Sequence, residues 1–197
     1  MLEFRLGNIR ITVSFWFLAA IGFFILYERS ALFFYFAVPI IVHELGHIIV
    51  LYLCGGSISA INLRAFGVDI CPNKLRLSYH HEIMVTIAGI ACNVIMALLL
   101  FWQRGQTMRS MLLISVNMAV AVFNILPIGN LDGGVLLRLL CEKTGNSHNT
   151  NTISCAVSFL LLLPLFILAF YLLLQPARNV TLLIVCIYLL VMVIRGG

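Results

Sequence analysis

Two histidines and a glutamate interrupt an apolar stretch and are the residues of this chain best suited to chemistry. His43, Glu44 and His47 are the only Asp, Glu, Lys, Arg or His residues between positions 31 and 63. Ionisable side chains are costly at bilayer depth, so a functional role is expected for them. Histidines four apart lie on one face of a helix, about 40° apart around its axis. Two such imidazoles can bind one Zn²⁺, and Glu44 can act as general base toward an activated water.

This HExxH spacing is rare by chance. With 5 His and 5 Glu in 197 residues, about 0.003 accidental matches are expected. The alternative is a pair of core histidines that hydrogen-bond to neighbouring helices. The low chance frequency favours the metal site.

A catalytic zinc site needs a third protein ligand and keeps its fourth position for water or substrate. Asp132 is the favoured candidate, because Gly133 and Gly134 let the backbone approach closely. Pro127 and Gly129 interrupt the preceding helix, and irregular backbone is tolerated at membrane depth where it lines a cavity. The alternative role of Asp132 is a helix N-cap. The other acidic and basic candidates are Glu82, Asp69, Glu142 and the remaining histidines.

Composition predicts a polytopic membrane protein. The chain is 62% hydrophobic and 10% charged, whereas a soluble domain has about 25% charged residues. Its net charge of +5 comes from singly scattered Lys and Arg, while nucleic-acid binding requires clusters, so no nucleic-acid partner is expected. One membrane-embedded domain over 1–197 is predicted, with no PDZ or CBS domain.

The expected fold is all-α with about six transmembrane helices. The predicted spans are 11–27, 31–54, 82–102, 108–126, 153–174 and 179–194. Residues 57–79 alternate between apolar and polar side chains, which predicts a short membrane-associated β-hairpin insert after the second span. Residues 1–10 alternate similarly and are expected along the interface.

The distribution of basic residues predicts the topology. With the N-terminus inside, eight of the 12 Lys and Arg residues fall on the cytoplasmic side and four outside, as the positive-inside rule requires. Both termini are then cytoplasmic. This arrangement places the HExxH motif and Asp132 at similar depth.

These motifs together resemble the site-2 protease family, peptidase family M50, of intramembrane zinc metalloproteases. The resemblance rests on His43-Glu44-Leu45-Gly46-His47, followed about ninety residues later by Asn124, Pro127 and Leu131-Asp132-Gly133-Gly134. It is greatest to the compact bacterial branch that includes the sporulation protease processing a pro-sigma factor. The resemblance implies that His43, His47 and Asp132 bind one Zn²⁺ per chain and that Glu44 is the catalytic base.

The resemblance also implies that Asn93, Asn124 and Pro127 line the site or its substrate groove. For Asn93, an interhelical hydrogen bond is the alternative. Asn130 stands where family members often have proline, two residues before the aspartate, which changes what fixes that loop.

By the resemblance, the chain hydrolyses a peptide bond in or near a transmembrane segment of a membrane-bound protein, for example a membrane-tethered transcription regulator. It implies a multi-pass protein of the bacterial cytoplasmic membrane and no particular oligomeric state. The competing readings are a divalent-metal transporter and a catalytically inactive scaffold that binds membrane helices. A transporter predicts further polar residues along the spans, and a scaffold predicts the loss of Glu44 or a ligand.

Overall fold

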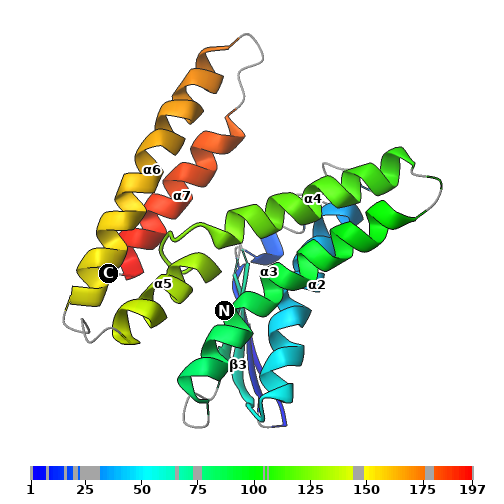
Figure 1. Ribbon diagram of the computed structural model, residues 1–197, viewed down its shortest axis with the longest axis vertical. Helices are drawn as coiled ribbons and strands as arrows, with labels where there is room; N and C mark the ends of the chain where they lie inside the picture. Colours follow the sequence, from blue (N-terminus) through cyan, green and yellow to red (C-terminus); the bar gives the residue numbers. More distant parts are fainter. Residues whose placement is uncertain are drawn as a thin grey trace. The chain divides into compact units, whose positions relative to one another are not determined.

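The computed structural model consists of two compact units, Met1–Ala121 and Val122–Gly197 (Figure 1). The structure describes residues 2–7, 9–15, 17–19, 22, 32–64, 67–72, 77–103, 105, 107–143, 149–175 and 180–196.

The first unit contains a four-stranded sheet with the order β1-β2-β3-β4. Strands β1 (Leu2–Leu6) and β2 (Ile9–Val13) form an antiparallel pair. Strand β2 runs parallel to β3 (Ile58–Arg64), and β3 pairs antiparallel with β4 (Gly67–Pro72). Both strands of the β3–β4 pair lie inside the predicted 57–79 insert. The parallel β2–β3 pairing joins the N-terminal segment to that insert, which local alternation does not predict.

Two sequence predictions are corrected by the structure. The predicted first span begins at residue 11, but Ile11–Val13 belong to strand β2. β-Branched residues favour a strand there, and hydropathy alone does not distinguish an apolar strand from the start of a span. The insert was extended to residue 79, but Tyr79 begins helix α3, where Ser78 accepts a hydrogen bond from the His81 N–H at 3.4 Å and caps the helix. Residues 23–30 of the first span and its turn lie outside the described residues.

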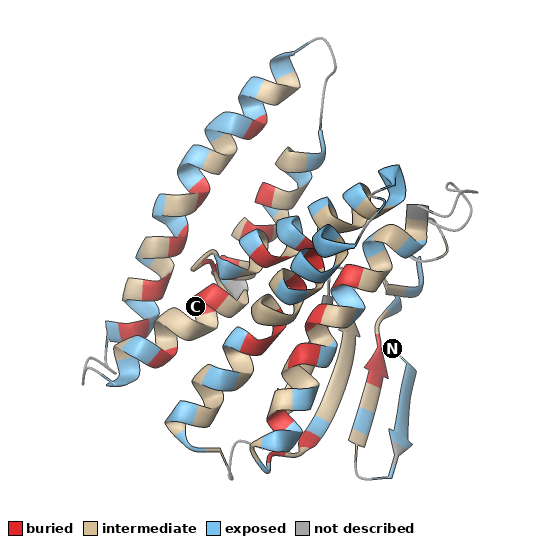
Figure 2. Ribbon diagram, turned by 45° about the vertical axis from the view of Figure 1, so that its right-hand side comes forward, coloured by how far each residue is buried: buried red, intermediate tan, exposed pale blue. Residues whose placement is uncertain are grey.

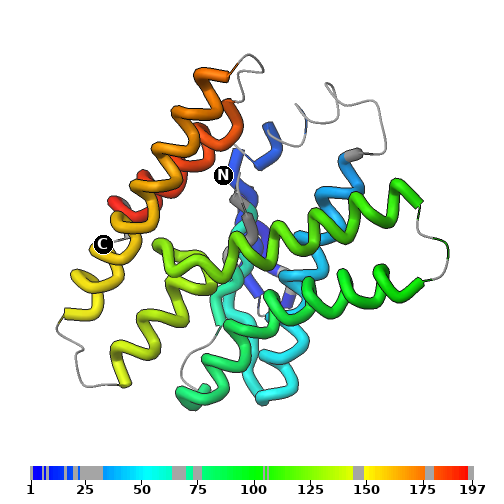
Figure 3. Tube along the Cα trace, turned by 45° about the horizontal axis from the view of Figure 1, so that its top comes forward, coloured from blue at the N-terminus to red at the C-terminus, as the bar shows by residue number. Residues whose placement is uncertain are grey.

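The helices of the first unit are α2 (Leu32–Leu53), α3 (Tyr79–Trp102) and α4 (Met108–Ile125), which belongs to this unit up to Ala121. Helices α2 and α3 lie side by side (Figure 3). Gly46 of α2 makes this approach possible, because a Cβ there would lie 2.8 Å from both the Ala88 carbonyl oxygen and the Cys92 Sγ.

The second unit contains α5 (Asp132–Lys143), α6 (Thr150–Leu174) and α7 (Thr181–Gly196). Helices α6 and α7 pack side by side around one apolar cluster. That cluster consists of Ile128, Leu162, Leu189 and Val193. Ile128 comes from the loop before α5 and is fully buried, so this cluster also anchors the loop.

Four described helices are long and apolar enough to cross a membrane: Phe33–Leu53, Tyr79–Trp102, Met108–Ile125 and Thr150–Leu174. Thr181–Ile194 is a shorter apolar helix. Many large apolar side chains on these helices are exposed, while a narrow set of positions is buried (Figure 2). Exposed apolar surface of this extent fits lipid contact, so the chain is an integral membrane protein. The number of six spans stays a prediction.

Candidate metal centre

The two histidines of the HExxH motif face each other on α2. Their Nε2 atoms are 3.2 Å apart, and their rings meet edge to face with centroids 4.7 Å apart. The His43 side chain is buried, with 4% of its surface exposed. The spacing of four residues therefore brings the two imidazoles onto one face of the helix, as predicted.

Helix α3 fixes the protonation of His47. The His47 Nδ1–H donates to the backbone carbonyl of Val85 at 2.7 Å. A carbonyl oxygen only accepts, so the proton lies on Nδ1 and the Nε2 lone pair is left for a metal. Metal-binding histidines usually have such a partner on the other ring nitrogen.

Two Nε2 atoms at this separation suit zinc. Zn–N distances of 2.0–2.1 Å in a tetrahedral site require the two nitrogens to be about 3.3 Å apart. The observed 3.2 Å matches this value. The separation of the two nitrogens is therefore compatible with both binding one Zn²⁺.

Gly89 of α3 makes room for both imidazoles. A Cβ at this position would overlap the His47 ring and approach the His43 Cε1 to 2.8 Å. Gly89 is buried, and together with the Val85 carbonyl it forms the α3 side of the histidine site. Neither group is among the site residues predicted from the sequence. The small pair Ala88-Gly89 within an apolar span is the signal for Gly89, because small residues mark close helix approach; the Val85 carbonyl has no sequence signal.

Asp132 is the first residue of α5, and two glycines press that end of the helix onto the preceding loop. A Cβ at Gly133 would overlap the Ile125 carbonyl and lie 2.6 Å from the Leu126 oxygen. A Cβ at Gly134 would overlap the Gly129 carbonyl. The Asp-Gly-Gly sequence thus lets α5 begin directly against the loop backbone.

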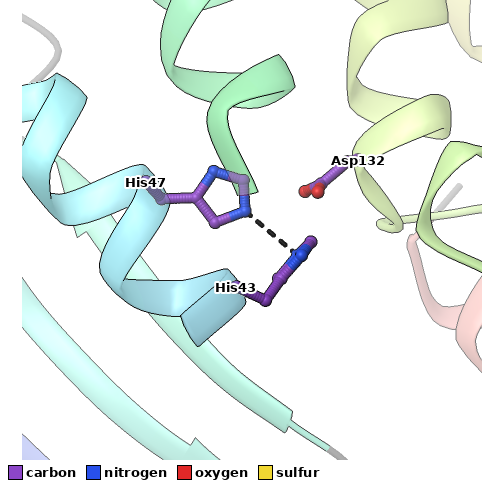
Figure 4. Close-up of side chains that lie close together, drawn as sticks. All are labelled: His43, His47 and Asp132. Atoms are coloured by element: carbon purple, nitrogen blue, oxygen red, sulfur yellow. Dashed lines mark hydrogen bonds between the residues drawn. The ribbon is translucent and has the colours of Figure 1, made fainter. Parts of the chain in front are cut away.

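The three predicted ligands come together. His43, His47 and Asp132 each offer one ligand atom, and these atoms lie within 4.8 Å of one another (Figure 4). Two imidazoles and a carboxylate are a donor set that zinc takes. No other group of three His, Cys, Asp or Glu side chains with this closeness occurs in the described part of the chain. Glu44 lies next to His43 on α2 and is partly buried.

The remaining predicted site residues have different surroundings. Asn93 is fully buried and donates through Nδ2 to the Pro39 carbonyl at 3.3 Å and the Asn117 carbonyl at 3.5 Å. These are the interhelical hydrogen bonds of the alternative reading. Asn124 is partly buried in the last turn of α4, and Pro127 is partly buried in the loop before α5.

Two comparisons with known proteins found similarities. The model of peptidase family M50 matches residues 102–165, a segment that includes Asp132 but not the HExxH motif. The structure is similar to the site-2 protease from Methanocaldococcus jannaschii, with a TM-score of 0.69 and 23% identity over 99% of this chain and 94% of that one. No match was found among curated proteins.

The chain has the fold of a site-2 protease. The resemblance to the site-2 protease family is thereby confirmed. The family model and the shared fold support an intramembrane metalloprotease in general terms.

Proposed function

We propose that the chain is an intramembrane zinc metalloprotease that cleaves a membrane-bound protein in or near a transmembrane segment. The observation that carries the proposal is the histidine pair, with Nε2 atoms 3.2 Å apart and the His47 proton held on Nδ1 by Val85. Asp132 completes a three-ligand donor set. Two hydrogen-bonded core histidines would not need a carboxylate beside them.

Each residue has a distinct role in this proposal. His43, His47 and Asp132 hold the ion, which supplies Lewis-acid activation of water and of the scissile carbonyl. Glu44 takes the proton from the attacking water and passes it to the leaving nitrogen. The Val85 carbonyl keeps His47 in the tautomer that binds metal, and Gly89 keeps both rings unobstructed.

The substrate must unwind before it is cut, because its peptide groups are hydrogen-bonded within a helix. An extended segment is held well by pairing with an exposed strand edge. Strand β4 lies at one edge of the sheet, which supports substrate pairing there. We further propose that Asn124 and Pro127 contact the substrate, and that the site lies in the cytoplasmic half of the membrane with both termini in the cytoplasm.

The test is cleavage of tagged single-span proteins in vesicles by the purified wild type and by Glu44→Gln. The wild type should produce a cut that a chelator abolishes and added Zn²⁺ restores, whereas Glu44→Gln should be at least about 100-fold slower, since general-base catalysis contributes roughly 10²–10⁴-fold. Equal cleavage by both proteins would contradict the proposal. Vesicle uptake of Zn²⁺ without any cleavage would favour the transporter reading instead.

A further inference from the structure

The loop that leads to Asp132 is held by side chains outside the ligand set. Arg138 of α5 donates through Nη2 to the Gly129 carbonyl at 2.9 Å and to the Asn130 Oδ1 at 2.8 Å. One Nη carries two hydrogens, so it can make both bonds at once. Hydrogen bonds from a charged donor are shorter and stronger than neutral ones.

Ser158 of α6 holds the same loop from a buried position. Its hydroxyl donates to the Ser154 carbonyl of its own helix at 2.7 Å, and this leaves lone pairs free to accept the Gly129 N–H at 3.1 Å. Ser158 is fully buried. A serine hydroxyl has one donor and two acceptor sites, so the bond to Ser154 orients it toward Gly129.

Gly129 is therefore fixed at both of its backbone polar groups. Its φ of +53° lies in the left-handed region, which glycine adopts readily. The next turn closes through the Leu131 N–H to the Ile128 carbonyl at 3.1 Å, and Asp132 follows directly. Any movement of Gly129 changes the position of the Asp132 backbone.

We propose that Arg138 and Ser158 are positioning residues that set the place of Asp132 as a metal ligand, an inference that rests on the proposed function. A proline at position 130 would restrain the loop through its fixed φ. Asparagine lacks that restraint, and in this chain Asn130 is restrained through its bond to Arg138. Arg138 thus restrains Asn130, and Arg138 and Ser158 together restrain Gly129, through hydrogen bonds.

The experiment measures metal binding by the full-length protein in detergent, after removal of its zinc. Zinc affinity is determined by competition with a chelating dye, and Co²⁺ absorption reports the ligand geometry. Arg138→Gln should weaken zinc binding roughly 10- to 100-fold and change the Co²⁺ spectrum, as expected for partners of metal ligands. Ser158→Ala should weaken zinc binding about tenfold. Arg138→Lys should bind zinc more tightly than Arg138→Gln, because it keeps a charged donor.

Two control variants remove a positive charge and a buried hydroxyl from the same two helices. Lys143→Gln removes a positive charge from the other end of α5. Ser154→Ala removes a buried hydroxyl one turn from Ser158 on the same helix. Both should bind zinc within about twofold of the wild type and leave the Co²⁺ spectrum unchanged, because Arg138 and Ser158 keep their bonds to the loop.

The outcomes separate this inference from the proposed function. A wild type that binds no zinc overturns both. Normal zinc binding by the wild type and by Arg138→Gln, or equal losses in the controls, overturns the inference alone. If Arg138→Gln does not fold, the Asn130→Ala variant tests the inference in its place, because it removes only the exposed acceptor of the Arg138 bond. Asn130→Ala should weaken zinc binding by about threefold or more, a smaller loss than for the partners of metal ligands. Unchanged zinc binding in Asn130→Ala overturns the inference.

Discussion

The histidine ligands and the aspartate ligand are positioned in different ways. His43 and His47 lie on one regular helix, and their separation follows from helical geometry together with one hydrogen bond from His47 to α3. Asp132 follows an irregular loop whose shape depends on Arg138, on Ser158 and on the buried side chain of Ile128. The two histidines are four positions apart on one helix, and their bond to α3 reaches 38 positions along the chain. The aspartate loop has no regular helix of its own, and Gly129 is held by a side chain 29 positions away.

This difference predicts which substitutions will disturb the positions of the metal ligands. A helix keeps its geometry through its own backbone bonds, so the histidine pair should tolerate changes unless they fill the space beside the rings. The loop before Asp132 has no regular series of backbone hydrogen bonds of this kind. Its position should respond to changes at residues that never approach the metal.

The largest loss of stability and zinc binding is expected for a substitution at Gly133. In Gly133→Ala, the new Cβ overlaps the Ile125 carbonyl and approaches the Leu126 oxygen, and backbone groups cannot rotate away as side chains do. The change should destabilise the protein by up to about 3 kcal/mol and abolish zinc retention. The measurements are the thermal midpoint in detergent and the zinc content; values like those of the wild type would show that the loop does not need this close contact.

A substitution at Gly89 should have a smaller effect, which falls mainly on zinc affinity and less on stability. Gly89→Ala places a Cβ against the His43 and His47 rings, which can shift at the expense of ligand geometry. Zinc affinity should fall about 10- to 100-fold, while stability changes by about 1 kcal/mol. Gly22→Ala is the control, because a Cβ there meets no atom of the described residues within 4 Å. Equal zinc affinity in the two variants would refute the role of Gly89.

The smallest change in stability and zinc binding is expected for a substitution at Asn93. Asn93→Ala removes donors to the Pro39 and Asn117 carbonyls, and interhelical hydrogen bonds in membranes contribute about 0.6 kcal/mol on average. The thermal midpoint should fall slightly, and zinc binding and cleavage should persist. Loss of cleavage with normal stability and zinc content would instead assign Asn93 to the substrate site.

The sequence predicted the parts of the molecule that local patterns determine. Helical spacing predicts that His43 and His47 share a face, and the long apolar runs predict α2, α3, α4 and α6 to within a few residues. The glycines after Asp132 correctly indicated close backbone approach.

Other features depend on contacts that no local pattern contains. Strand β2 was read as the start of a span because its partner β3 lies about fifty residues away. The bond from His47 to the Val85 carbonyl involves a backbone atom, which every residue has, so sequence cannot single it out. The bonds of Arg138 and Ser158 to the loop required the structure for the same reason.

The central claim is that His43, His47 and Asp132 together hold one zinc ion. The most direct test is the zinc content per chain of the protein purified in detergent, compared among the wild type, Asp132→Ala and Asp69→Ala, which removes the other aspartate of the chain. The account predicts about one zinc for the wild type and Asp69→Ala and a strong loss in Asp132→Ala, since a catalytic site needs three protein ligands. Full zinc occupancy in Asp132→Ala, or none in the wild type, would contradict it.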